Sequence, residues 1–181
     1  MTLVPASSGG GTVSGVSVTG TAASGQVPVA SSATAGAWGY PPGYEINYTQ
    51  ITANVNIVST TEATGTTILS PGAITFDGTL VLCHFYAPRI QADTSSAGDV
   101  VIVSLFEGAT QIARLGVVTT LITTTNFSST MSAFYRFTPT AASHTYTITA
   151  FASSTTGTPI VGAGAGGTAA YSPAFVRFTK V

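Results

Sequence analysis

The sequence carries very little charge. Only 6% of its 181 residues are Asp, Glu, Lys or Arg, and the formal net charge is −1, whereas a typical soluble domain is about 25% charged. The five cationic residues are scattered along the chain: Arg89, Arg114, Arg136, Arg177 and Lys180. Because binding to nucleic acid requires a basic surface that neutralises phosphates, we expect no nucleic-acid partner.

Cysteines and long apolar runs are also scarce. Cys83 has no second cysteine to pair with, so an intrachain disulfide is excluded. It lies in an apolar run, and we expect it to be a small buried hydrophobe. No apolar run approaches the roughly 18 residues that a membrane-spanning helix needs. The start of the chain lacks the basic and apolar regions of a signal peptide. We therefore expect no membrane partner.

The patterns of metal sites and common catalytic sites are missing too. His84 and His144 lack the His-x-His spacing of a cupin-type site, so we expect no metal and no cofactor. We interpret His84 as packed or subunit-facing and His144 as hydrogen-bonded. The six carboxylates are dispersed along the chain: Glu45, Glu62, Asp77, Asp93, Asp99 and Glu107. Of these, Asp77, Asp99 and Glu107 flank glycines at turns, where turn-forming hydrogen bonds explain them. No Gly-x-Ser-x-Gly elbow occurs. We expect no enzyme; a glycan hydrolase with two carboxylates on facing strands is the enzymatic alternative.

The first 44 residues contain no charged side chain and consist mostly of Gly, Ser, Ala, Thr and Val. Weak alternation within residues 13–18 favours an extended conformation. Fixing one backbone residue costs roughly 1–2 kcal/mol, whereas a fully buried valine or leucine returns about 1.5–3 kcal/mol. With so few large apolar side chains, we expect residues 1–44 to be an extended arm that needs the surface of a partner. The expected contact residues are Leu3, Val4, Val13, Val16, Val18, Val27, Val29, Trp38 and Tyr40.

Residues 45–181 have the pattern of one all-β domain. Short runs rich in Val, Ile and Thr alternate with turn residues, and Asp77-Gly78 predicts a hairpin. This number of short strands predicts a single jelly-roll β-sandwich. The predicted strands are 48–58, 66–69, 73–76, 79–87, 99–106, 110–115, 117–123, 131–137, 144–151, 158–161 and 171–181.

Aromatic residues occur in adjacent pairs on these strands, as in Phe85-Tyr86 and Phe134-Tyr135. Neighbours in a strand point to opposite faces, so one member of a pair can fill the core while the other needs a second cover. A subunit interface is the natural cover. The expected interface residues are His84, Tyr86, Tyr135, Tyr171 and Phe175.

Several segments of the head domain carry a resemblance to a known family. They are 48–52, 74–78, 84–88, 105–108, 136–139, 143–146 and 173–180. Together they resemble a head domain of structural proteins from tailed bacteriophages, which is similar to the tumour-necrosis-factor-like jelly roll that assembles as tight trimers. The resemblance covers about residues 45–181 and implies a homotrimer in the virion. Family members serve as capsid decoration (cement) proteins, head fibres or tail-tip components.

The main hypothesis is a capsid decoration protein. The trimer formed by residues 45–181 would sit on the outer surface of a phage capsid. Its arms would bind the major capsid protein and stabilise the shell. The chain has neither the heptads nor the Gly-X-Y triplets of a fibre shaft, which weakens a fibre assignment. The alternative is a tail or head-fibre component whose jelly roll recognises a glycan or the host.

Overall fold

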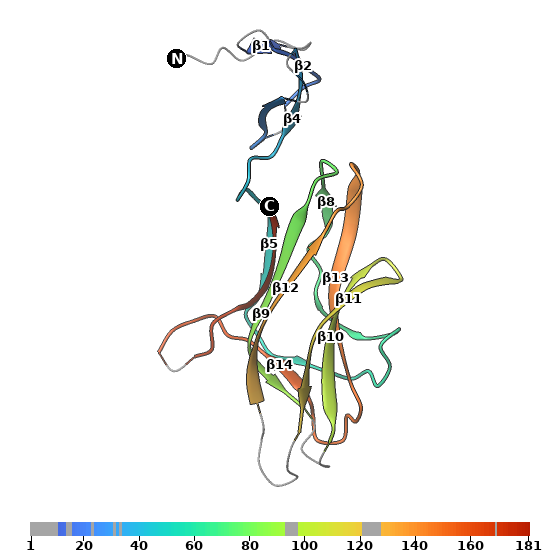
Figure 1. The fold of residues 1–181 in the computed structure, drawn as a ribbon. Coiled ribbons are helices and arrows are strands. Elements are labelled where there is room, and N and C mark those ends of the chain that lie inside the picture. Colours follow the sequence, from blue (N-terminus) through green and yellow to red (C-terminus); the bar gives the residue numbers. More distant parts are fainter. Residues whose placement is uncertain are drawn as a thin grey trace. The chain divides into compact units, whose positions relative to one another are not determined.

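The computed structural model of the chain describes residues 11–13, 16–22, 24–30, 32, 34–92, 98–120, 128–168 and 170–181. The chain divides into two compact units, Met1–Tyr44 with Lys180–Val181, and Glu45–Thr179. The described residues form strands, turns and loops, with no helix among them (Figure 1). We call the first unit the N-terminal unit and the second the head.

The N-terminal unit contains a small sheet. Its strands, in the order β1-β2-β4-β3, are β1 (Gly11–Val13), β2 (Val16–Thr19), β4 (Ala35–Gly39) and β3 (Val27–Ala30). The sequence predicts an extended arm that needs the surface of a partner. In the structure the backbone is extended, but these strands pair with one another. Gly20 and Gly25 have positive φ angles of 89° and 81°. Such turns reverse the chain, so that backbone groups find hydrogen-bond partners within the unit.

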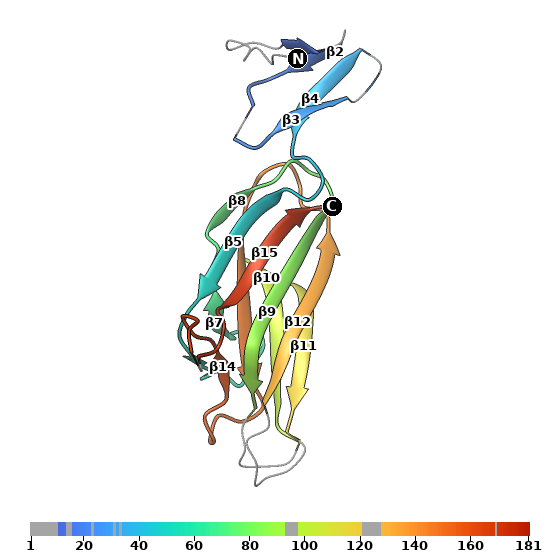
Figure 2. The ribbon, with the colours of Figure 1, turned by 90° about the vertical axis from the view of Figure 1, so that its left-hand side faces the viewer.

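Two sheets form the head (Figure 2). The first contains β5 (Glu45–Ile51), β15 (Ala174–Lys180), β9 (Val81–Gln91), β14 (Ile160–Gly162) and β6 (Val55–Asn56), and β12 (Ser128–Phe137) pairs with the other side of β9. The second contains β11 (Thr110–Thr119), β10 (Val100–Glu107), β13 (Ser143–Ala152) and β7 (Thr66–Leu69), and β8 (Ala73–Thr75) also pairs with β13.

The strand order defines a jelly roll. The long strands run β5-β15-β9-β12 in the first sheet and β7-β13-β10-β11 in the second. Within the described part of the head, consecutive strands repeatedly change sheet, whereas β10 and β11 form a hairpin within one sheet. This is the eight-stranded double Greek key of a jelly roll. The predicted fold class is therefore confirmed.

The core lies between the two sheets and follows the alternation of the strands. In β9 the side chains of Val81, Cys83, Phe85 and Ala87 are fully buried, while the residues between them are partly exposed. Phe178 and residues of the facing sheet complete this apolar layer. Cys83 is a buried hydrophobe as predicted, and its burial raises the pKa of the thiol to about 12.

The hairpin predicted at Asp77-Gly78 is wrong, although the turn itself is present. Gly78 has a φ angle of 80°, and the Asp77 carboxylate accepts a hydrogen bond from the backbone N–H of Thr79 at 3.2 Å. The strands on either side belong to different sheets: β8 pairs with β13, and β9 with β12. A turn signal specifies a reversal of the chain, but it does not specify that the flanking strands pair.

Candidate interaction surface

The outward side of the first sheet carries a cluster of aromatic rings. We call it the aromatic face and define it by Tyr48, His84, Tyr86, Phe134 and Phe175, which come from four adjacent strands. In Figure 2 these strands lie side by side and face the viewer. Phe134 is 62% exposed and Tyr48 is 44% exposed. Large apolar side chains gathered on one exposed surface are typical of interaction sites.

Strand register aligns these side chains in rows. Phe134 lies opposite His84, and Arg177 lies opposite Tyr48. One step along, Ser132 lies opposite Tyr86, and Phe175 opposite Gln50. Directly opposite residues in a sheet share a face. The contacts of Arg177 with His84 and of Phe175 with Tyr86 connect the two sets of pairs across β9 and β15.

Ring contacts hold the aromatic face together. The ring of Phe175 lies 5.2 Å from that of His84, 5.3 Å from Tyr48 and 5.4 Å from Tyr86, measured between centroids. The His84 ring stacks on Phe134 at 4.2 Å. Phe175 is thus the centre of the cluster, and Phe134 is its exposed margin.

His84 is fixed by polar contacts on both ring nitrogens. Its Nε2 lies 3.1 Å from the Ser132 hydroxyl, and its Nδ1 lies 3.4 Å from a terminal nitrogen of Arg177. Because a guanidinium only donates hydrogen bonds, Nδ1 accepts and Nε2 carries the proton. Partial burial lowers the pKa of His84, and the nearby Arg177 charge lowers it further.

The loop before β15 extends the aromatic face at one end. The Ser172 hydroxyl donates a hydrogen bond to the Tyr86 hydroxyl at 3.4 Å. The guanidinium carbon of Arg89 lies 5.7 Å from the ring centroid of Tyr171, within the range of a cation–π contact. Tyr171 remains 46% exposed.

The structure brings together four of the five predicted interface residues. His84, Tyr86, Tyr171 and Phe175 lie on or beside the aromatic face. Tyr135 lies outside the aromatic face: it points to the inner side, packs against the core and stacks on Phe137 with centroids 5.8 Å apart. The outward member of that pair is Phe134.

Tyr48 was not among the predicted interface residues. Its strand begins three residues earlier, at Glu45, and Tyr48 lies opposite Arg177 on the outward side. Because Tyr48 and Ile51 are three residues apart, they face opposite sides of the strand. An apolar Ile51 on the core side could therefore have predicted that Tyr48, whose ring carries a polar hydroxyl, lies on the outward side.

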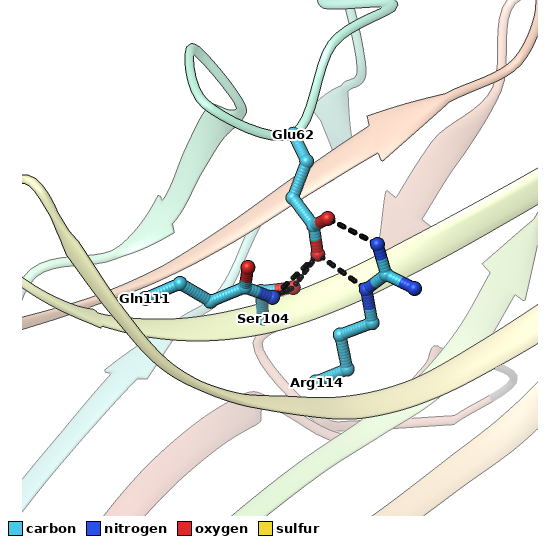
Figure 3. A network of polar contacts seen from close by, with 4 residues as sticks. All are labelled: Glu62, Ser104, Gln111 and Arg114. Carbon is cyan, nitrogen blue, oxygen red and sulfur yellow. Dashed lines mark hydrogen bonds and ion pairs between the residues drawn. The ribbon is translucent and has the colours of Figure 1, made fainter.

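Elsewhere in the described part of the head, two polar clusters contain an ion pair. In Figure 3 the Glu62 carboxylate accepts hydrogen bonds from Ser104 at 2.8 Å, Gln111 at 2.6 Å and the Arg114 Nε at 2.8 Å. The Arg114 contact is the main cause that lowers the pKa of Glu62 to about 2. This network ties the loop before β7 to strands β10 and β11. We interpret the network as structural, because the polar groups of its four residues hydrogen-bond to one another.

The second cluster surrounds His144, which is hydrogen-bonded as predicted. Its Nδ1 lies 2.5 Å from a carboxylate oxygen of Glu107, and its Nε2 lies 3.0 Å from the Thr140 hydroxyl. The hydrogen bond to Glu107 raises the pKa of His144. Within the described ranges, no group of three or more His, Cys, Asp and Glu side chains is arranged to hold a metal ion. Asp93 lies outside these ranges.

The apolar residues of the N-terminal unit have two different roles. Val18 is buried, and the Trp38 indole donates a hydrogen bond to the Gly20 carbonyl at 3.0 Å, so these side chains stabilise the unit itself. Tyr40 stacks on Tyr44 with centroids 4.7 Å apart. By contrast, Val27 and Val29 on β3 are 40% and 47% exposed.

The remaining predicted contact residues of this unit are less informative. Val13 and Val16 lie opposite each other in β1 and β2. Leu3 and Val4 lie outside the described residues.

Across the part of the chain that the structure describes, no helix is long and apolar enough to span a membrane.

Comparison with known proteins gives similarity to solved structures. No protein-family model matches the chain, and no curated protein matches it. Among solved structures, the chain is similar to VP2 in the subviral particle of infectious bursal disease virus, with 14% sequence identity and a TM-score of 0.36. The match covers 86% of this chain and 42% of the VP2 chain. The jelly-roll assignment rests on the strand order and register described above.

Proposed function

We propose that this chain is a virion structural protein that decorates the outer surface of a phage head as a homotrimer. The observation that carries the proposal is the division of the chain into two units, each with an apolar surface of its own. The head has the aromatic face, and the N-terminal unit has the exposed valines of β3. One surface gathers copies of the chain, and the other attaches them to the shell.

The aromatic face is the proposed trimer interface. Aromatic residues and arginine are enriched in the centres of protein interfaces, and they carry much of the binding energy there. Phe175 and Phe134 supply aromatic rings to the proposed interface, and Arg177 supplies an arginine beside them. The resemblance of the head to trimeric phage domains supports the same assembly.

The N-terminal unit is the proposed site for the major capsid protein. Residues 1–44 of this unit have no charged side chain, so a partner can cover this segment without desolvating a charged side chain. Val27 and Val29 lie on β3, an edge strand of the small sheet. Three such units on one trimer would bind with avidity, because the second and third attachments are intramolecular.

Capsid binding by the full-length protein tests this function. The variant Val27→Asp/Val29→Asp should remain a trimer but lose cosedimentation with undecorated capsids, because charged side chains would oppose apolar contact. Val58→Asp is the matched control, since Val58 is a 76% exposed valine on the head. Removal of residues 2–40 should have the same effect as the double variant.

Undiminished capsid binding by both the double variant and the truncated chain would refute the assignment of the N-terminal unit. Glycan binding by the full-length protein, combined with no affinity for capsids, would instead favour the alternative of a tail or fibre component that recognises a host.

A further inference from the structure

Two exposed ions without a partner mark the opposite edges of the aromatic face. Arg136 lies on β12 and Glu45 lies on β5, and both are exposed. The side chain of neither residue makes a hydrogen bond or ion pair with any residue that the structure describes. Elsewhere in the described part of the head, Glu62 binds Arg114, and Glu107 binds His144.

Strand register places these two ions on the same row of the sheet. Arg136 lies opposite Leu82 on β9, and Glu45 lies opposite Thr179 on β15. The contacts of His84 with Arg177 and of Tyr86 with Phe175 align β9 with β15. One further step of two residues brings Leu82 level with Thr179.

The two charged side chains are not paired within one copy of the chain, since no ion pair joins them among the described residues. Their backbones are separated by three strand spacings of about 4.8 Å each, or about 14 Å, with Leu82 and Thr179 between them. A second copy can provide the missing partner. In a three-fold ring every interface is heterologous, so one edge of a subunit meets a different surface of its neighbour.

We propose that self-association through the aromatic face joins Arg136 of one copy to Glu45 of the next. This inference rests on the proposed trimer, and it identifies the contact that orients the subunits. The aromatic rings supply apolar area, which is indifferent to direction. The ion pair at the margin selects one arrangement, because any packing that brings Arg136 to Arg136, or Glu45 to Glu45, places like charges together.

Charge reversal tests the contact in the full-length protein. Sedimentation equilibrium would compare the wild type with Arg136→Glu, Glu45→Arg and the variant that carries both changes. Each single reversal creates a like-charged pair and should raise the dissociation constant by at least about tenfold, whereas the double reversal should restore it to within about threefold. At about 1 M salt the effect of each single reversal should shrink, because the Debye length falls to about 3 Å.

Controls separate this contact from a general effect of charge. Thr110→Glu adds a negative charge at an exposed position on the other sheet and should leave association unchanged. Circular dichroism and a thermal melt would show that the variants fold.

Each outcome bears on a different part of the proposal. A wild-type trimer in which the two reversals simply add would overturn the ion pair and leave the trimer standing. A wild-type dimer in which the double reversal restores association would overturn the trimer and leave the ion pair standing. A wild type that is monomeric at all concentrations would overturn both.

Discussion

The opposite orientations of Phe134 and Tyr135 lead to opposite expectations for two neighbouring alanine variants. Phe134 is 62% exposed, so Phe134→Ala removes little buried area from the head. Full burial of such a side chain contributes about 3 kcal/mol, so the buried third and the stacking on His84 together account for about 1–2 kcal/mol. Tyr135 packs against the core, and Tyr135→Ala should cost about 2–4 kcal/mol because it leaves a cavity.

The effect on association should run the other way. Truncating an aromatic anchor at an interface typically costs about 2 kcal/mol or more, so Phe134→Ala should raise the dissociation constant of the oligomer by about 30-fold. Urea unfolding at a concentration where the chain is monomeric would measure the stability of the head, and light scattering over a concentration series would measure association. The reasoning fails if Phe134→Ala destabilises the head as much as Tyr135→Ala, or if it leaves the oligomer unchanged.

Three further predictions concern the polar clusters and the N-terminal unit. The pKa of Glu62 is lowered from 4.5 to about 2, so the stability that its ionised form contributes is complete above pH 4.5 and disappears as the pH falls toward 2. In urea titrations, Glu62→Gln should therefore lower the free energy of unfolding by about 1–2 kcal/mol at pH 7 and by nearly nothing at pH 2. The pKa of His144 is raised by its bond to Glu107, so this contribution is complete below pH 6.5 and is lost as the pH rises through the folded-state value; His144→Gln should flatten the pH dependence of the urea midpoint above neutrality, and an unchanged slope would contradict the assignment. Gly25 has a φ angle of 81°, and a Cβ there would overlap the Tyr44 ring; Gly25→Ala should expose the N-terminal unit to limited proteolysis while the melting temperature of the head stays constant.

Alternation in the sequence was sufficient to predict most strands of the head. Two predictions are wrong: the single strand predicted over 48–58 is divided into β5 and β6, and the separate strands predicted over 110–115 and 117–123 are one strand, β11, as far as Thr119. The apolar run that contains Cys83 and Phe85 became a long strand, β9, with one fully buried side. Residues 66–69 were predicted with the observed bounds of β7. Such patterns are local, because side chains on one strand alternate with a period of two wherever the strand lies.

Choices that depend on distant parts of the chain could not be predicted in the same way. Alternation shows that Phe134 and Tyr135 face opposite sides, but the core side is determined by the register of β12 on β9. The turn at Asp77-Gly78 likewise gives no information on which sheet each flanking strand joins. In the N-terminal segment, weak alternation predicted extended backbone, and the pairing of β2 with β4 depends on turns between them.

The position of β15 in the first sheet has a consequence for biosynthesis. This strand follows all the other described strands of the head in sequence, yet it lies between β5 and β9 and supplies Phe175, the centre of the aromatic face. During translation the sheet therefore stays open until residue 180 has emerged from the ribosome, and β5 must wait for a partner more than 120 residues away. Contacts of such long sequence separation form slowly. The proposed self-association through the aromatic face therefore requires a head whose last strand has already joined the sheet.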